Sequence, residues 1–257
     1  MVLTYKIELL SCFPHDYEQN LYLGIIQLPD PLIQPIIMAL ALFDLDNTLL
    51  AGDSDYLWGV FLSEQGIVDK DFYERENQRF YQEYKDGKLD IFEFLAFSLK
   101  PLADNRLSDL QRWHAGFMQE KILPLISEQA MDLVEKHRQA GDTLLVITAT
   151  NAFVTAPIVK QFGIEHLIAT EPELIDGRYT GRVAGIPCYQ EGKVKRLSHW
   201  LTQHNASTDD AWFYSDSHND LPLLRKVGHP VAVDPDDVLA HAATDAGWPV
   251  ISLHAPA

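Results

Sequence analysis

Two carboxylates and a hydroxyl follow directly after an apolar run of the chain. The run 38–43 leads into the motif Asp44-x-Asp46-x-Thr48. Two acids two positions apart in a turn can point into one site, where one attacks phosphorus and the other transfers protons. A divalent cation would reduce their mutual repulsion. The alternative is an ordinary polar turn that binds its own backbone amides, so the motif does not identify a site by itself.

A hydroxyl and a lysine occur at two later places. Thr148 ends the apolar stretch Val-Ile-Thr, where its hydroxyl could hold a phosphate oxygen together with backbone amides. Its alternative is to cap the helix that follows. Lys193 lies near the start of an amphipathic segment, 192–204, where a lone lysine is usually a solvated surface residue. Neither residue points to a site when taken alone.

A second acidic loop follows the apolar run 211–215. It carries Asp216, Asn219 and Asp220. Acids four positions apart at the end of a strand can divide the work, since one can bind a metal while the other orients a lysine. The alternative is a capped loop before a helix that is predicted to begin near Leu221.

Strand-like runs alternate with helical segments through most of the chain. Runs typical of buried strands occupy 38–43, 143–150, 211–217 and 230–235. Helices are predicted at about 125–140, with Gly141 as the C-cap, at 152–163 and at 192–204. Asp176-Gly177 between two short extended runs predicts a hairpin. The alternation predicts an α/β fold with a doubly wound, mainly parallel, Rossmann-like sheet, whose ligands bind beyond the carboxyl ends of the strands.

A helical block interrupts this alternation between the first two strands. Apolar and aromatic residues recur there at spacings of three and four, in two stripes made of Tyr56, Val60 and Phe61, and of Phe72, Tyr73, Phe80 and Tyr84. We therefore expect a catalytic core of residues 38–52 and 125–257 with a helical cap at 53–124. Residues 1–37 contain four prolines and no long periodic segment, which indicates an N-terminal extension with Met38 as the natural start.

The bulk composition excludes several classes of partner. The chain has 257 residues, a formal net charge of −17 and a pI of about 4.8. Such an acidic chain is not expected to bind nucleic acid or an anionic membrane, and an anionic substrate would need a local positive potential. No run approaches the ~18–20 apolar residues of a membrane span, and the first 20 residues lack the apolar core of a secretory signal. The two cysteines, Cys12 and Cys188, are far apart, which favours a reduced cytoplasmic protein.

The acid pair, the hydroxyl, the lysine and the second acid pair follow strand-like runs in that order. In this order the chain resembles the phosphatases of the haloacid dehalogenase-like hydrolases, over residues 39–252. The resemblance implies that Asp44 is the nucleophile that becomes an aspartyl phosphate and that Asp46 is the general acid and base. A dehalogenase of this family lacks the acid at the position of Asp46.

The same resemblance implies roles for the remaining residues. Thr148, Lys193 and Asn219 would bind the phosphoryl group, and Asp220 would hold Lys193 in place. The metal would be Mg²⁺, bound by the carboxylates of Asp44 and Asp216 and by the backbone carbonyl of Asp46. The helical block would be a lid that closes over the active site.

The chain is similar to the phosphoserine-phosphatase-like branch, and the cap bears on the substrate. In that branch an acid nine residues after the nucleophile binds the substrate ammonium group, and Asp53 holds this position. The arginine that would hold the serine carboxylate has no counterpart in 89–101, where the charged groups nearest to that position are Glu93 and Lys100. Bacterial members of the branch include histidinol-phosphate phosphatases, to which the stretches 52–62 and 247–253 are similar.

An amine and a ring without a carboxylate make histidinol phosphate the best substrate prediction. Aromatic residues of the cap could stack on such a ring or could merely pack the cap's own core; they are Tyr56, Trp58, Phe61, Tyr73, Phe92, Phe94, Phe97 and Trp113. Phosphoserine, another small phosphomonoester and phosphate transfer to an alcohol are alternatives. The non-enzymatic alternatives are a phospho-accepting module, as in receiver domains, and an inactive phosphatase that acts as a binding module. The oligomeric state cannot be predicted.

Overall fold

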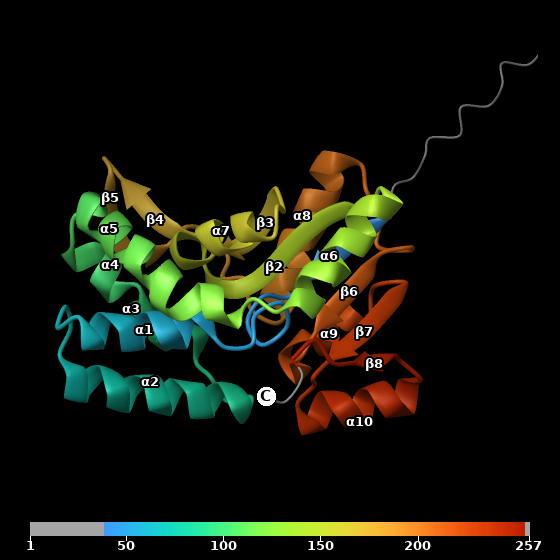
Figure 1. Ribbon diagram of the computed structural model, residues 1–257, viewed down its shortest axis with the longest axis horizontal. Coiled ribbons are helices and arrows are strands. Elements are labelled where there is room, and N and C mark those ends of the chain that lie inside the picture. The colour runs from blue at the N-terminus through green and yellow to red at the C-terminus, as the bar shows by residue number, and fades with distance from the viewer. Residues whose placement is uncertain (1–38, 255–257) are drawn as a thin grey trace, which may run out of the picture. The chain divides into compact units, whose positions relative to one another are not determined.

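The computed structural model describes residues 39–254, and the predicted extension 1–37 lies outside the described residues. A six-stranded sheet forms the centre of the fold (Figure 1), in the order β3-β2-β1-β6-β7-β8, with every neighbouring pair parallel. Its strands are β1 (Leu40–Phe43), β2 (Thr143–Asn151), β3 (His166–Thr170), β6 (Trp212–Ser215), β7 (His229–Val233) and β8 (Val250–Ile251). The predicted doubly wound parallel sheet is confirmed.

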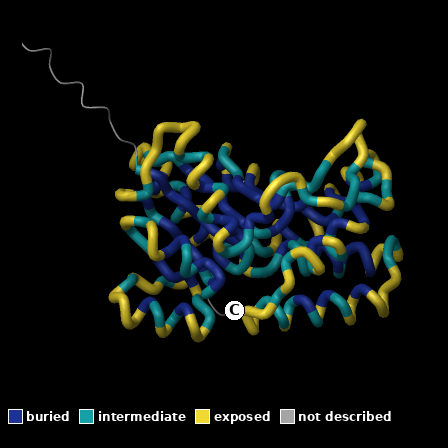
Figure 2. Tube along the Cα trace, turned by 180° about the vertical axis from the view of Figure 1, so that it is seen from behind, coloured by how far each residue is buried: buried dark blue, intermediate teal, exposed yellow. Residues whose placement is uncertain are grey.

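Both faces of the sheet are covered by helices because successive side chains of each strand point to opposite faces. Ala41 and Phe43 belong to one buried cluster and Leu40 and Leu42 to the other. The first cluster includes α6 (Glu128–Ala140) and α7 (Ala152–Gln161). The second includes α8 (Glu191–His204), α9 (Leu221–Leu224) and α10 (Asp237–Ala246). Figure 2 shows the buried residues gathered in the centre, with exposed residues along the outer helices.

Six α-helices lie between β1 and β2, and the first five occupy the region where a helical block was predicted. These five are α1 (Ser54–Glu64), α2 (Lys70–Lys85), α3 (Ile91–Ser98), α4 (Lys100–Asp104) and α5 (Leu107–Phe117). Short helical turns, Met118–Ile122 and Leu123–Leu125, complete the insertion. Asp53, Asp69 and Asp90 each accept backbone N–H bonds at the start of α1, α2 and α3, which fixes where these helices begin. We call this block, 54–125, the cap.

Most local predictions hold, with two corrections. Gly141 caps α6 with a φ of 83°, and β4 (Pro172–Ile175) pairs with β5 (Arg178–Val183) as the predicted hairpin. The helix predicted from about 125 begins only at Glu128, since Ser127 caps it. Phe72 does not belong to a buried stripe, because 42% of its surface is exposed.

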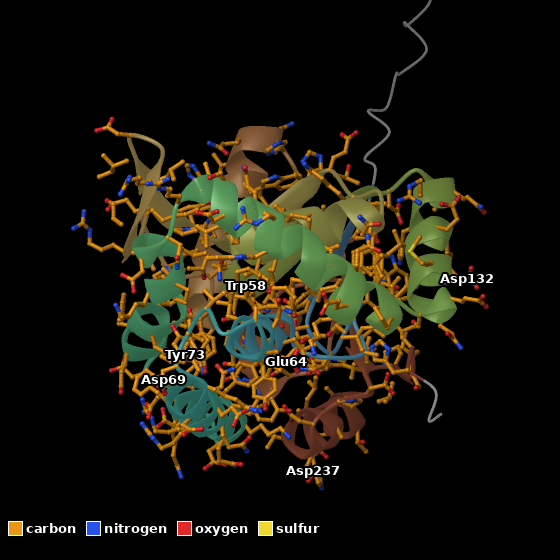
Figure 3. All side chains as sticks on the ribbon, turned by 60° about the vertical axis from the view of Figure 1, so that its left-hand side comes forward. Trp58, Glu64, Asp69, Tyr73, Asp132 and Asp237 are labelled. Carbon is orange, nitrogen blue, oxygen red and sulfur yellow. The ribbon has the colours of Figure 1, made fainter. Side chains whose placement is uncertain are left out.

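Side chains of the helices divide between inward and outward positions. In Figure 3, Trp58 of α1 lies inside the packing of the cap, whereas Asp132 of α6 and Asp237 of α10 point away from the molecule. Trp58 stacks on Phe61 and meets Phe117 edge to face.

No helix between residues 39 and 254 is long and apolar enough to cross a membrane.

Candidate active site

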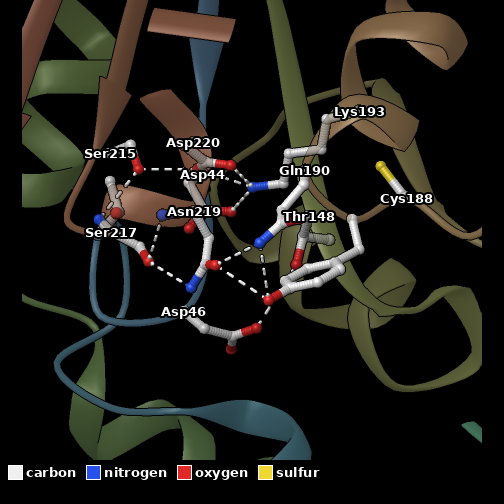
Figure 4. Close-up of polar contacts among 12 residues, drawn as sticks. Asp44, Asp46, Thr148, Cys188, Gln190, Lys193, Ser215, Ser217, Asn219 and Asp220 are labelled. Atoms are coloured by element: carbon white, nitrogen blue, oxygen red, sulfur yellow. Dashed lines mark hydrogen bonds and ion pairs between the residues drawn. The ribbon is translucent and has the colours of Figure 1, made fainter. Parts of the chain in front are cut away.

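A buried lysine joins two of the predicted acids. Lys193 Nζ donates to the carboxylates of Asp44, at 2.9 Å, and Asp220, at 2.8 Å (Figure 4). Each of the three residues exposes 4% of its surface or less. Asp44 follows β1 and Asp220 follows the neighbouring β6, while Lys193 comes from the first turn of α8. The parallel order of the strands therefore brings Asp44 and Asp220 to Lys193, although they are 149 and 27 positions away from it in the sequence.

The charges of this group favour a bound cation. Burial raises the pKa of Asp44 to about 7, although Lys193 lowers it. Burial lowers the pKa of Lys193, but Asp220 and Asp44 outweigh this effect, so its pKa lies above the ordinary value and it stays an ammonium. One ammonium thus faces more carboxylates than it can neutralise. A second positive charge would favour the ionised form of Asp44.

Asp46 is held by a backbone amide and two hydroxyls. The Ser54 N–H donates to Oδ1 at 2.7 Å, and Thr150 Oγ1 donates to Oδ2 at 2.8 Å. Thr148 Oγ1 lies 3.5 Å from the same Oδ2. Burial raises the pKa of Asp46 to about 6, and the neighbouring Asp53 raises it further. A carboxyl with a pKa near neutrality can both give and take a proton.

Thr150 was missed in the sequence, although a signal for it exists. Residues two apart in a strand face the same side, so a site at Thr148 implies that Thr150 also lies there. The structure extends β2 to Asn151, whose side chain caps α7 by accepting the Val154 N–H. The alternative role of Thr148 as a helix cap is therefore wrong. Its side chain lies in the site and is 1% exposed.

Asp216 follows β6, the neighbour of β1, and is oriented by Thr48. Thr48 Oγ1 donates to Asp216 Oδ1 at 3.0 Å and accepts the Asp216 N–H at the same distance. Burial raises the pKa of Asp216 well above its ordinary value, and Asp44 adds to this effect. The two carboxylates are thus close enough to repel each other.

This donor set fits Mg²⁺. Within 39–254, no three His, Cys, Asp or Glu side chains are grouped to hold a metal. Mg²⁺ does not need such a cage, because it binds through one or two carboxylates, substrate phosphate and water. Asp44 and Asp216 supply two mutually repelling carboxylates, and the Asp46 carbonyl would be a third oxygen. These three residues would hold the ion.

Asn219 is engaged by other protein groups. Its Oδ1 accepts from Tyr189 Oη and Gln190 Nε2, each at 2.9 Å, and its Nδ2 donates to Ser217 Oγ at 3.2 Å. Gln190 has a φ of 46°, a costly conformation for a residue with a side chain. Asn219 does not line the cavity described below. In this structure it positions Tyr189 and Gln190, a connection that the sequence did not predict.

A cavity of about 70 Å³ joins this centre to the cap. Lys193, Asp44, Asp46 and Thr148 line its core side. The other side is lined by Asp53 and by the cap residues Asp55, Tyr56, Asn77, Phe80, Tyr81, Tyr84, Leu89, Ile91 and Phe94. Of the eight cap aromatics considered for substrate stacking, only Tyr56 and Phe94 reach it. Trp58 and Phe61 pack in the core instead, and Phe92 is 68% exposed.

The end of α2 closes the cavity against the second acidic loop. Tyr84 Oη lies 3.1 Å from Ser217 Oγ, and the Tyr84 carbonyl accepts a bond of 3.4 Å from Asn219 Nδ2. Asp53 lies on the opposite wall, where one carboxylate oxygen caps α1 through the N–H groups of Asp55 and Tyr56. Asp55 and Tyr81 were not singled out in the sequence, since an acid and a tyrosine on a helix are ordinarily surface or packing residues.

The comparisons with known proteins agree with this geometry. The family model of the haloacid dehalogenase-like hydrolases matches residues 41–225. The chain belongs to this family. It is 46% identical over 218 residues to a histidinol-phosphatase of Neisseria meningitidis, covering 83% of this chain and 98% of that one. It is also 27% identical over 222 residues to a phosphoserine phosphatase of Mycobacterium tuberculosis, covering 83% of this chain and 70% of that one, and both relatives place it among the phosphatases of the family.

Solved structures show the same fold. A protein of unknown function from Bordetella pertussis is 45% identical, with a TM-score of 0.80, over 84% of this chain and 99% of that one. A substrate-bound phosphoserine phosphatase has a TM-score of 0.63 at 18% identity, over 84% of this chain and 93% of that one. The second likeness concerns the fold alone.

Proposed function

We propose that this phosphatase hydrolyses histidinol phosphate, with Mg²⁺ and through an aspartyl phosphate on Asp44. The observation that carries the proposal is the charge of the cavity wall. Among the described residues that line the cavity, Lys193 is the only cation, and four carboxyl groups belong to the wall. A substrate carboxylate would meet acids there without a partner, whereas an amine and an aromatic ring would meet acids and aromatic side chains.

The relative from Neisseria meningitidis supports this substrate, because it carries the name histidinol-phosphatase and aligns over nearly its whole length. Phosphoserine fits less well, since its carboxylate needs a cation on the cap side. The substrate would be a small-molecule phosphate monoester in either case. A cytoplasmic location stays a prediction from the sequence.

In the first step, one carboxylate oxygen of Asp44 attacks phosphorus while the bond to the substrate's alkoxide oxygen breaks. Lys193 bonds to Oδ1 of Asp44, and no residue between 39 and 254 donates a hydrogen bond to Oδ2, which leaves that oxygen available. Asp46 gives its proton to the leaving oxygen. Lys193 and Thr148 bind the phosphoryl oxygens, and Mg²⁺ would supply further positive charge for the phosphoryl group.

In the second step, Asp46 accepts a proton from a water molecule, whose oxygen attacks the phosphorus of the aspartyl phosphate. The bond between Asp44 and phosphorus breaks, and inorganic phosphate leaves. Asp46 ends with the proton that it lost in the first step. The contacts from Ser54 and Thr150 hold its carboxyl in one place for both transfers.

The test is phosphate release from histidinol phosphate, phosphoserine and p-nitrophenyl phosphate, with Mg²⁺ or EDTA, by the wild-type protein and Asp44→Asn. We expect the highest kcat/KM on histidinol phosphate and no turnover in EDTA or by the variant. Equal or better turnover of phosphoserine would refute the substrate. Wild-type turnover by Asp44→Asn would refute the mechanism.

A further inference from the structure

Asp55 is a half-buried acid that no protein group neutralises. It is the second residue of α1, and its N–H is used by Asp53, but no residue between 39 and 254 forms a hydrogen bond or ion pair with its carboxylate. Burial raises its pKa well above the ordinary value, and Asp53 and Asp46 raise it further. An unpartnered acid in such a place destabilises the fold. Because Asp55 lines the cavity, its carboxylate is free to pair with a ligand group instead.

The carboxylate lies at the end of the cavity that is remote from the reacting atoms. A smaller void behind the cavity is also lined by Asp55, Asn77 and Phe94, and neither Lys193 nor Thr148 lines it. Asp53 lies nearer the centre, because the adjacent Ser54 N–H bonds to Asp46 and Asp53 does not line the smaller void. The two acids are therefore at different depths along one ligand path.

The walls beside Asp55 are suited to a flat ring. Tyr56 and Tyr81 lie with their ring centres 5.6 Å apart, and Phe80 and Phe94 meet edge to face at 5.3 Å. All four line the cavity. Aromatic walls favour a planar group, and an unpartnered carboxylate favours one that carries an N–H or a delocalised positive charge. An imidazole ring has both properties.

We propose that Asp55 selects substrates by accepting a hydrogen bond from the ring N–H of an imidazole-bearing phosphomonoester. Asp53, at intermediate depth, is left to face the substrate's ammonium group. This inference rests on the proposed function, whose substrate carries both groups. It adds the residue that separates this substrate from phosphomonoesters that have an amine but no ring.

The experiment compares Asp55→Leu with wild type on histidinol phosphate and on phosphoethanolamine, which has an amine but no ring. Leucine has nearly the shape of aspartate and fits the apolar wall. We expect kcat/KM on histidinol phosphate to fall by about 10- to 100-fold, mainly through KM, because the lost bond is remote from phosphorus. On phosphoethanolamine it should change by less than about 3-fold, a change worth less than 1 kcal/mol.

A matched control is Asp71→Leu, since Asp71 is also the second residue of a helix capped by an aspartate, but is exposed. It should leave both activities unchanged. The melting temperature of Asp55→Leu should not fall. If Asp55 had only a structural role, the melting temperature would fall. Equal losses on both substrates, or no loss on either, would overturn this inference alone. Absence of wild-type turnover of histidinol phosphate, with turnover of other phosphomonoesters, would overturn the proposed substrate and this inference with it.

Discussion

As the pH rises from 5 to 8, the stability of the metal-free Asp44→Asn variant should improve relative to that of the wild-type protein. Burial raises the pKa of Asp44 from 3.8 to about 7. Between these values the folded carboxyl holds a proton that the unfolded chain has lost. The contribution of Asp44 to stability is therefore full below pH 3.8 and is lost as the pH rises through about 7.

The magnitude follows from linkage. One pKa unit corresponds to about 1.4 kcal/mol. Between pH 5 and pH 8 a single carboxyl with this shift loses about 2.5 kcal/mol of folding free energy. Lys193 stays charged across this range, and its attraction for the ionised form of Asp44 is already contained in the pKa of about 7. The variant also lacks the negative charge of ionised Asp44, which repels Asp216. This increases the expected gain in relative stability of the variant at pH 8.

The assay is urea unfolding, followed by circular dichroism, at pH 5 and pH 8 in EDTA. We expect the difference in unfolding free energy between wild type and Asp44→Asn to shift by about 2.5 kcal/mol in favour of the variant at pH 8. Asp132→Asn, at an exposed acid of α6, is the control and should show no such shift. Mg²⁺ at pH 8 should stabilise wild type more than the variant. A difference that is the same at both pH values would refute the assignment of a raised pKa to Asp44.

Three further predictions concern the chemistry and the cap. Asp46→Asn should slow turnover at least about 100-fold and leave a phosphoenzyme that gel analysis of acid-quenched samples detects, since proton transfer is lost in both steps; a rapid loss of that species would contradict the role. Thr150→Val removes a bond that lowers the pKa of Asp46, so the pH profile of kcat should move up by about one unit, and an unmoved profile would argue against Asp46 as the titrating group. Tyr84→Phe breaks the contact of α2 with Ser217 and should raise KM about 2- to 10-fold with little change in melting temperature; an unchanged KM would show that this contact does not hold the cap closed.

The contacts that orient the site were the part that sequence patterns did not reveal. Asn219 was expected to contact phosphate, but Tyr189 and Gln190 occupy its carbonyl oxygen. Tyr189 and Gln190 lie about 30 positions before Asn219, so no local pattern connects them to it. Asp55 lies two positions from the predicted Asp53, but in a helix that spacing does not put both side chains on one face, so only the structure shows that Asp55 also lines the cavity.

The sequence by itself determined four of the six strands of the parallel sheet, the hairpin and the loops that carry Asp44 and Asp216, but not the strands β3 and β8. These features depend on local periodicity, turn residues and helix caps, which a few neighbouring residues specify. It also identified the family, because the acids, the hydroxyl and the lysine follow strands in a distinctive order.

Only the tertiary structure decided which side chains share the site. The pairing of β1 with β6 brings Asp44 to Asp220, and α8 then places Lys193 between them. Tertiary packing also determines that Tyr56 and Phe94 line the cavity, whereas Trp58 is buried in the core. Burial and the raised pKa values of the acids have the same origin, since the removal of water depends on neighbours that are distant in the chain.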